Sequence, residues 1–423
     1  MMYSVLGVGV AVFFGVALKK FNWALGFLIV AFPAYVVRLK FGSLPSTLLE
    51  VVFGVVFLAW LILYVRVDLP VLFTKIREHR YFFALFALFF VASLLGVAVS
   101  DMVILSFGQW RAYFLEPMVL FLILVARSRA LSPGQLVWPL AISTLSLSVY
   151  AVVQKFTGFG IATPEWTAAA TRRVTAFYTS PNAVALYLAP LIFLGVAFAA
   201  KLYKENKQRE AGSMVVIVAA SLMAIAFTFS QGALIALAAG FVVFIALIGY
   251  KKSALFLVGS GVVLVGVLVF SPNALPLHYK SAGNRVILWR YSQEFLTASP
   301  KNFVLGAGVR QFFRKIQKPY YDVKKLERLI YPHNIFLNFW TETGLLGMLS
   351  FASIYAYMLH GAYVVYRQGD KIWGAGLVAM LVVFFVHGLI DVPYFKNDLA
   401  MLFWVLAALV LLFNTKNNET MQR

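Results

Sequence analysis

Long apolar stretches without charged residues constrain this chain more than any other feature. Residues 81–100 and 130–154 contain no Asp, Glu, Lys or Arg, and residues 211–250 form an apolar stretch broken only by Ser230-Gln231-Gly232. An α-helix rises 1.5 Å per residue, so about 20 apolar residues cross a hydrocarbon layer of ~30 Å. Backbone groups in lipid must be hydrogen-bonded within their own segment, so these stretches are expected to be helices. The stretch 211–250 is long enough for a tight helical hairpin.

Similar stretches recur along the whole chain. The first apolar stretch, Tyr3–Leu18, lacks a preceding basic segment and a following small-residue cleavage site, which favours a membrane helix over a signal peptide. Pro33 interrupts the second, which leaves open whether one of the first two is shallow or broken. We predict an all-α polytopic membrane protein with about 12 (11–13) transmembrane helices. The remaining candidate spans are Tyr3–Leu18, Asn22–Val37, Leu44–Val65, Trp110–Val125, Pro181–Ala200, Ser253–Phe270, Asn338–Tyr366, Ile372–Ile390 and Leu399–Phe413.

The composition excludes several classes of protein. The chain of 423 residues is 62% hydrophobic and 12% charged, whereas soluble domains are roughly 45–50% apolar and about 25% charged. Its net charge is +20, but the cations lie between the apolar stretches and no soluble domain carries them, so no nucleic-acid partner is expected. The absence of Cys excludes disulfides and thiolate metal sites.

The distribution of Lys and Arg predicts the orientation in the membrane. Apart from one long loop, alternate connections carry eighteen Lys or Arg on one side and seven on the other. The side richer in cations is normally cytoplasmic. The connections around Arg172, Gln231 and Asp391 are therefore expected outside. Arg38 and Lys40 also fall outside if both of the first two stretches cross.

The long loop, residues 271–334, contains eleven Lys or Arg and three acidic residues. The orientation count places it outside, against the usual bias, which is weakest for loops of about this length. Two interpretations remain open. The loop is either a solvated cationic segment lying on lipid headgroups or an electropositive lid over an anionic substrate.

Several residues within this loop are candidates for chemistry. A helix is predicted to begin near Asn284 and to end at Ser299-Pro300, with Arg285 and Trp289 four residues apart on one face. Arg290 lies about 140° further round the same helix. The Gly306-Ala307-Gly308 segment is more typical of a turn than of a phosphate-binding nest. His333 lies where the loop meets the next membrane helix, where an imidazole can act on a substrate hydroxyl.

These residues, in this order, resemble the signature of the O-antigen ligase and polymerase superfamily of bacterial membrane glycosyltransferases. The stretch from Arg172-Arg173 to Pro181-Asn182 is similar to an outer loop of that family, and so is the closing stretch from His387 to Asp398. Gln231 stands where many members have an arginine. The matching elements are Arg285-x-x-x-Trp289, Pro300, Gly306-x-Gly308, Pro332-His333-Asn334 and Glu342-x-Gly344-x-x-Gly347.

The resemblance implies a metal-independent, inverting, GT-C-like transferase that needs no cofactor. Its active site would lie at the outer face of the cytoplasmic membrane, with a glycan on undecaprenyl diphosphate as donor and a lipid, protein or glycan hydroxyl as acceptor. It also implies His333 as the base, with Arg285 and one of Arg172 or Arg173 holding the diphosphate. Ligase and polymerase activities both remain open. Further candidate substrate-binding residues are Arg290, Trp289, Asn334, Glu342 and Gln231.

The residue types agree with this chemistry. A diphosphate leaving group needs a metal ion or fixed cations to neutralise it, and the outer connections contain no Asp-x-Asp and no His-rich cluster. Arginine binds phosphate through paired donors and keeps its proton. For the nearby pair His387 and Asp391, helix capping is favoured over acid–base pairing. We expect one membrane domain, residues 1–423, with residues 271–334 as its lid.

Two other functions agree less well with the sequence. A transporter or flippase for lipid-linked glycans would use ionisable groups near the membrane midplane and often consists of two related halves. Glu50, Glu116 and Glu342 lie toward the ends of their predicted helices, and the chain shows no repeat. A cell-wall polymerase of another family would not be expected to carry Pro332-His333-Asn334 just before a helix.

Overall fold

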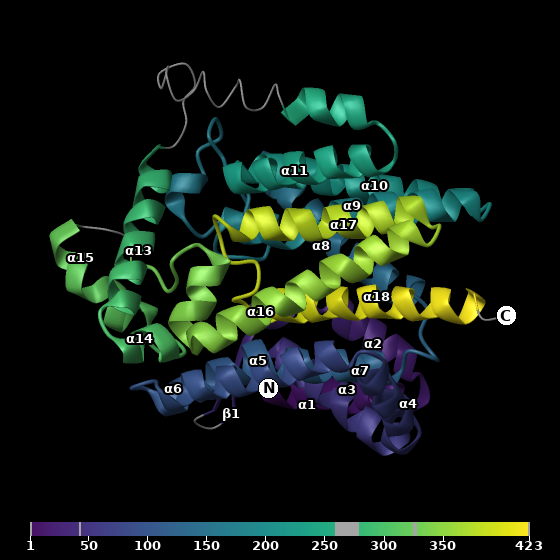
Figure 1. Cartoon of the computed structure of the whole chain (residues 1–423), viewed down its shortest axis with the longest axis horizontal. Coiled ribbons are helices and arrows are strands. Elements are labelled where there is room, and N and C mark those ends of the chain that lie inside the picture. Colours follow the sequence, from purple (N-terminus) through teal and green to yellow (C-terminus); the bar gives the residue numbers. More distant parts are fainter. Residues whose placement is uncertain (1, 42–43, 259–278, 325–327, 422–423) are drawn as a thin grey trace.

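The computed structural model describes residues 2–41, 44–258, 279–324 and 328–421. Most of its helices lie lengthwise in one bundle (Figure 1). The α-helices are α1 (Met2–Lys19), α2 (Phe21–Val30), α3 (Leu48–Leu63), α4 (Val65–Glu78), α5 (Arg80–Ala98), α6 (Val103–Trp110), α7 (Glu116–Ala126), α8 (Gly134–Thr157), α9 (Pro181–Lys204), α10 (Gln208–Thr228), α11 (Gln231–Leu247), α13 (Tyr279–Thr297), α14 (Pro300–Leu305), α15 (Lys318–Lys324), α16 (Ile335–Arg367), α17 (Lys371–Gly388) and α18 (Asn397–Met421).

Short elements connect these helices. They are the 3-10 turns η1 (Phe32–Val36) and η3 (Pro164–Trp166), the π-helical turns η2 (Arg111–Leu115) and η4 (Phe312–Gln317), and the strands β1 (Arg38–Phe41) and β2 (Leu44–Thr47). The predicted partly helical loop is confirmed in its described part by α13, α14, η4 and α15.

Within the described residues, seven helices are long and apolar enough to cross a membrane, or eight if α3 and α4, bent by 96°, form one span. Shorter apolar helices cover Leu6–Lys19, Phe21–Val30, Gln231–Leu247 and Asn397–Leu412. The all-α polytopic class is therefore supported, whereas the predicted number of about 12 spans is not confirmed. Most of the predicted span Ser253–Phe270 lies outside the described residues.

The second predicted span, Asn22–Val37, is not one helix. α2 ends at Val30, and Pro33, which has no N–H for a helical hydrogen bond, lies in the 3-10 turn η1. The chain then forms the antiparallel hairpin β1–β2, a departure from the purely helical prediction. Thr47 and Glu50 form a reciprocal capping box that begins α3 directly after the hairpin.

The predicted helical hairpin of residues 211–250 is confirmed by α10 and α11. The reversal occurs at Phe229, whose φ of 51° lies in the left-handed region, and at Ser230. α11 packs along α17, and α9 packs against both α10 and α17. A Cβ on Gly232 would lie 2.9 Å from Ile390 and 3.4 Å from the His387 ring, so this glycine allows α11 to approach the end of α17.

A turn of the long loop is locked onto a kink in α16. Gly306, Gly308 and Gly344 all have positive φ, which confirms the predicted turn at Gly306–Gly308. The backbone N–H of Ala307 donates to the carbonyl of Thr341 at 2.7 Å. A Cβ on Gly306 would lie 2.4 Å from the carbonyl oxygen of Trp340, so the contact requires glycine.

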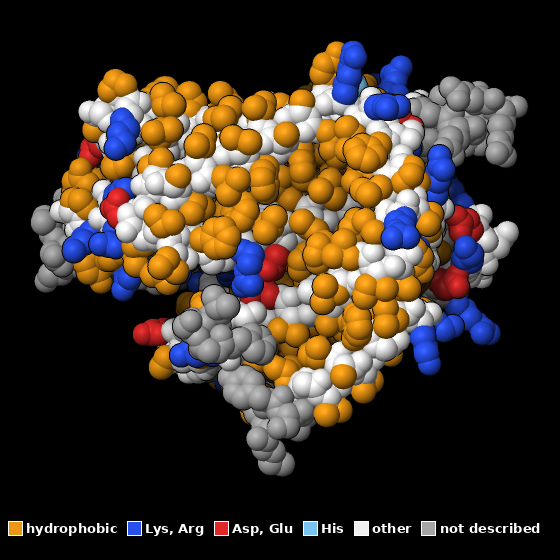
Figure 2. Space-filling model, turned by 90° about the horizontal axis from the view of Figure 1, so that it is seen from below, with side chains coloured by type: hydrophobic (Ala, Val, Ile, Leu, Met, Phe, Trp, Pro, Cys, Tyr) orange, Lys and Arg blue, Asp and Glu red, His pale blue; other side chains and the backbone are white. Residues whose placement is uncertain are grey.

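The strands β1 and β2 and the segments 279–324, 328–334 and 389–396 lie at the same end of the bundle, which we call the loop end (Figure 1). The face seen in Figure 2 is largely hydrophobic, and Lys and Arg gather toward its two ends. This distribution is the one expected for helices that cross a lipid bilayer.

Candidate active site

His333 and Asp391 form a hydrogen-bonded pair at the loop end. His333 directly precedes the cap of α16 and has a φ of 56°, and its Nδ1 lies 3.1 Å from Oδ1 of Asp391. Asn334 caps α16 by accepting from the backbone N–H groups of Phe336 and Leu337, and its side-chain amide donates to the carbonyl of Leu389. Asn334 therefore fixes the backbone beside His333.

The sequence favoured helix capping for Asp391, but its carboxylate has a different partner in the structure. The Asp391 backbone N–H does donate to the His387 carbonyl, but its buried carboxylate pairs with His333. It also accepts from the backbone N–H of Val392 at 2.9 Å and from Nδ2 of Asn182 at 3.4 Å. Hence this aspartate joins α16, the end of α17 and the start of α9.

The surroundings of Asp391 keep it ionised. Burial by itself would raise the pKa of Asp391, but interactions with His333, His387 and Arg285 outweigh burial and hold this pKa well below its ordinary value. An ionised carboxylate only accepts hydrogen bonds, so Nδ1 of His333 is the donor. The Nε2 atom of His333 is then the ring nitrogen that Asp391 does not engage, and an imidazole can exchange protons through such an atom.

The helix α13 places Arg285 near this pair. Arg285 is half-buried, and its charge acts on both Asp391 and His387. The indole N–H of Trp289 donates to the carbonyl of Pro332 at 3.0 Å and so ties α13 to the turn that holds His333. Arg290 is exposed and makes no ion pair or hydrogen bond within the described residues.

The two candidate arginines of the 158–180 connection have different surroundings. Nε of Arg173 donates to the carbonyl of Thr228 at 2.8 Å, and its Nη2 lies 3.4 Å from Oδ1 of Asn182, which itself contacts Asp391. Burial lowers the pKa of Arg173. Arg172 donates to the backbone carbonyls of Lys155, in the last turn of α8, and of Thr167, in its own connection. Arg173 is thus the one in the network of His333.

Glu342 and Gln231 lie outside this network. Glu342 is buried and accepts from the backbone N–H of Arg310, with Nε2 of Gln109 at 3.5 Å. It therefore helps to hold the glycine turn of the loop. Gln231 is the exposed first residue of α11, and it makes no hydrogen bond to the His333 group within the described residues.

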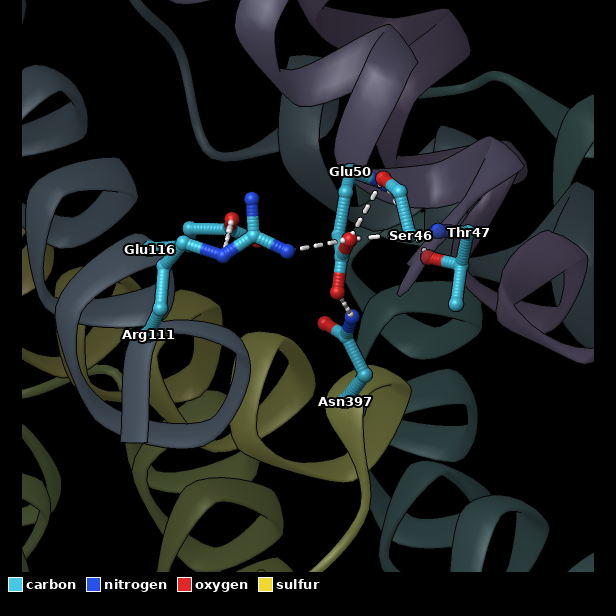
Figure 3. Close-up of polar contacts among 6 residues, drawn as sticks. All are labelled: Ser46, Thr47, Glu50, Arg111, Glu116 and Asn397. Atoms are coloured by element: carbon cyan, nitrogen blue, oxygen red, sulfur yellow. Dashed lines mark hydrogen bonds and ion pairs between the residues drawn. The ribbon is translucent and has the colours of Figure 1, made fainter. Parts of the chain in front are cut away.

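A second polar cluster at the loop end was not predicted. Arg111 lies between Glu50 and Glu116, and Asn397 points to Glu50 from the start of α18 (Figure 3). The only signal in the sequence was the presence of these charged residues inside apolar stretches. Across the described ranges, no group of three or more His, Asp or Glu side chains could hold a metal ion.

One known protein family matches a part of the chain that contains some of these site residues. Residues 215–352, about a third of the chain, match the family model described as O-antigen ligase. This part of the chain is similar to that family. This confirms the resemblance seen in the motifs. The matched range contains the candidate residues Arg285, His333 and Glu342, whereas Arg173 and Asp391 lie outside it. No curated protein matches the chain.

Proposed function

We propose that the protein transfers a glycan from undecaprenyl diphosphate to an acceptor hydroxyl at the outer face of the bacterial cytoplasmic membrane. The match of residues 215–352 to the O-antigen ligase family model supports a membrane enzyme of the ligase or polymerase type. The observation that carries the proposal is the His333–Asp391 pair, with Arg285 close by. These residues lie at the same end as the basic loop, whose charge suits an anionic donor.

We assign a role to each side chain. Nε2 of His333 takes the proton of the acceptor hydroxyl as its oxygen attacks the anomeric carbon of the donor sugar. Asp391 holds the imidazole in the required tautomer and stabilises the imidazolium that forms. Attack on the face opposite the diphosphate breaks the glycosidic C–O bond and inverts the anomeric configuration. His333 then returns its proton to water.

The departing diphosphate gains negative charge as this bond breaks. We assign its neutralisation to Arg285 and Arg173, because guanidinium groups bind phosphate oxygens through paired donors and stay protonated. Fixed cations placed where charge develops stabilise the transition state more than the ground state. Ligase and polymerase share these steps and differ only in the acceptor, which is lipid, protein or glycan.

The experiment is glycan transfer in vesicles that contain lipid-linked donor. His333→Ala should lower transfer by roughly 10²- to 10⁴-fold, because a positioned general base contributes about this much. Protein level and donor binding should stay near those of the wild type. His360→Ala is the matched control, since His360 is exposed on the distant half of α16 and should leave transfer unchanged. Activity within threefold of wild type for His333→Ala would reduce His333 to a structural residue.

A further inference from the structure

A cavity of about 430 Å³ lies between the end of α9 and the start of α17. Its volume falls within the range of ligand pockets, roughly 300–1,000 Å³. Asn182, at the start of α9, contacts Asp391, which follows α17, so the other ends of these two helices lie at the loop end. Because α9 and α17 are about 36 and 27 Å long, the cavity lies at the opposite end of the bundle (Figure 1).

Two lysines and an apolar wall line this cavity. Lys201 and Lys204 lie about one turn apart in α9, on neighbouring positions of its surface. The apolar wall consists of Ala197, Ile372 and the buried Trp373. The Nζ atom of Lys201 lies 5.8 Å from the centroid of the Trp373 ring. A ligand that fills the cavity therefore meets ammonium groups and hydrocarbon surface together.

The two carboxylates that also line the cavity are engaged with other groups. Nζ of Lys207, which is not part of the lining, lies 2.7 Å from Oε2 of Glu205. The carboxylate of Asp370 accepts from the backbone N–H of Trp373 and so caps α17. Lys204 makes no hydrogen bond or ion pair within the described residues. Its ammonium group can therefore bind an anion in the cavity.

Positive charge predominates around the cavity. The segments 201–207 and 367–371, which supply its polar lining, contain five Lys or Arg and two acidic residues. A concave site with this excess of cations attracts anions. The phosphate of a lipid headgroup and inorganic phosphate share the required chemistry, and the depth of the cavity in the membrane distinguishes between them.

The cavity lies at the depth of lipid headgroups. α9 is long and apolar enough to cross a bilayer, and Lys201 and Lys204 belong to its last turn. Tyr203, between them, is 66% exposed, and aromatic side chains at helix ends are typical of the membrane–water interface. Basic pockets between membrane helices bind anionic lipid headgroups. The apolar wall offers a hydrated inorganic anion no hydrogen bonds, whereas it suits the glycerol and the first acyl carbon atoms of a phospholipid.

We propose that this cavity binds the headgroup of a phospholipid with a net negative charge, between α9 and α17. Lys201 and Lys204 donate to its phosphate oxygens, and the apolar wall contacts its glycerol. The bound lipid joins the ends of two helices whose other ends lead to Asn182 and Asp391. The site is separate from the His333 group, and the proposal does not depend on the proposed transferase function.

The test titrates the full-length, delipidated protein in detergent with lipid and follows binding by native mass spectrometry and by Tm. Phosphatidylglycerol should bind more tightly than phosphatidylcholine with the same acyl chains. It should also raise Tm more, because a ligand that binds only the folded state stabilises it. Inorganic phosphate should not displace the lipid. Equal binding of the two lipids would overturn the proposal, and so would displacement by millimolar phosphate, since the cavity would then hold a soluble anion.

Variants locate the bound lipid. Lys201→Ala combined with Lys204→Ala should weaken phosphatidylglycerol binding about thirtyfold, because each basic residue at the membrane surface contributes roughly fivefold. Arginine at both positions keeps the charge and should retain most of the binding. The matched control is Lys19→Ala combined with Lys20→Ala, which removes the same charge from two exposed lysines outside the cavity. Equal losses in the two alanine variants would indicate a diffuse cationic surface and would overturn the defined site.

A second variant covers the case in which the double alanine variant does not fold. Lys204 is exposed, so Lys204→Glu should keep the wild-type Tm in neutral lipid. Reversal of its charge should still weaken phosphatidylglycerol binding and leave phosphatidylcholine binding unchanged. Unchanged phosphatidylglycerol binding in Lys204→Glu would contradict the proposal. Glycan transfer plays no part in these measurements, so a failure here leaves the proposed function untouched.

Discussion

At the scale of single residues, the site depends on a carboxylate that stays ionised. Asp391 is 4% exposed in its side chain and contacts His333, Asn182 and the backbone of Val392. Its lowered pKa means that the pair with His333 persists through the neutral pH range. In the proposed mechanism, this arrangement prepares the imidazole to accept a proton before any substrate arrives.

Asp391→Asn tests this role. The amide keeps the shape but loses the charge that stabilises the imidazolium, so turnover should fall about 10²-fold with little change in donor KM. Because the folded-state pKa is lowered, Asp391 stabilises the fold above its ordinary pKa of about 4, and this stabilisation is lost as the pH falls through the lowered value. The difference in Tm between wild type and variant should therefore shrink as the pH falls below about 4. A difference that is equally large at about pH 3 and about pH 6 would contradict the ionised state.

Substitutions at Arg285 separate the effect of its positive charge from the effect of its planar guanidinium geometry. If it grips the departing diphosphate, Arg285→Ala should lower kcat more than it weakens donor binding. Arg285→Lys keeps the charge but loses the planar pair of donors, and should recover only part of the activity. Arg290→Ala should cost far less, because Arg290 is exposed and lies about 140° away on the same helix. Equal, mild losses at both positions would indicate a diffuse cationic loop over anionic lipid.

At the scale of elements, glycines lock the loop to the bundle. The turn at Gly306 meets the kink of α16 at Gly344, and a Cβ on either residue would lie 2.4 Å from a backbone carbonyl oxygen. Lys315 adds an ion pair to Asp101 at 3.0 Å and donates to the Ala307 carbonyl. The position of Arg285 on α13 therefore depends on contacts made by a different part of the same segment.

Gly306→Ala should loosen this lock. Steric conflict with the Trp340 carbonyl and the positive φ together should cost about 1–3 kcal/mol of unfolding free energy. We expect a lower Tm in detergent and a higher donor KM. Gly283→Ala is the matched control, because a Cβ there meets nothing within 4 Å and alanine is favoured inside a helix. An unchanged Tm for Gly306→Ala would show that the loop does not rest on α16 in the membrane.

At the scale of the whole molecule, the proposed mechanism requires that the loop lie on the outer side of the membrane. Short connections carry eighteen Lys or Arg on one side and seven on the other, so reporters fused near Lys204 should read cytoplasmic. Reporters fused near Lys324, in the loop, and near Gln231 should read external. A cytoplasmic signal at Lys324 would overturn the mechanism, because the loop could not meet a donor presented at the outer face.

The sequence alone determined the class of the protein, because partition into lipid and hydrogen bonding within a helix are local properties. The α10–α11 reversal at Ser230, the end of α13 before Ser299-Pro300 and the glycine turn at 306–308 were predictable for the same reason. His333 and Arg285 were predicted as site residues because they lie within motifs that are short and continuous.

Tertiary structure decided which residues meet. The partner of His333 lies 58 residues away, and only the packing of α16 against α17 brings Asp391 to it. Asn397 reaches Glu50 across 347 residues, so no local pattern could indicate the Arg111 cluster. The choice of Arg173 over Arg172 likewise depends on where Asn182 and the end of α10 lie. Such contacts follow from how helix surfaces fit together, a property of distant segments jointly and not of any one of them.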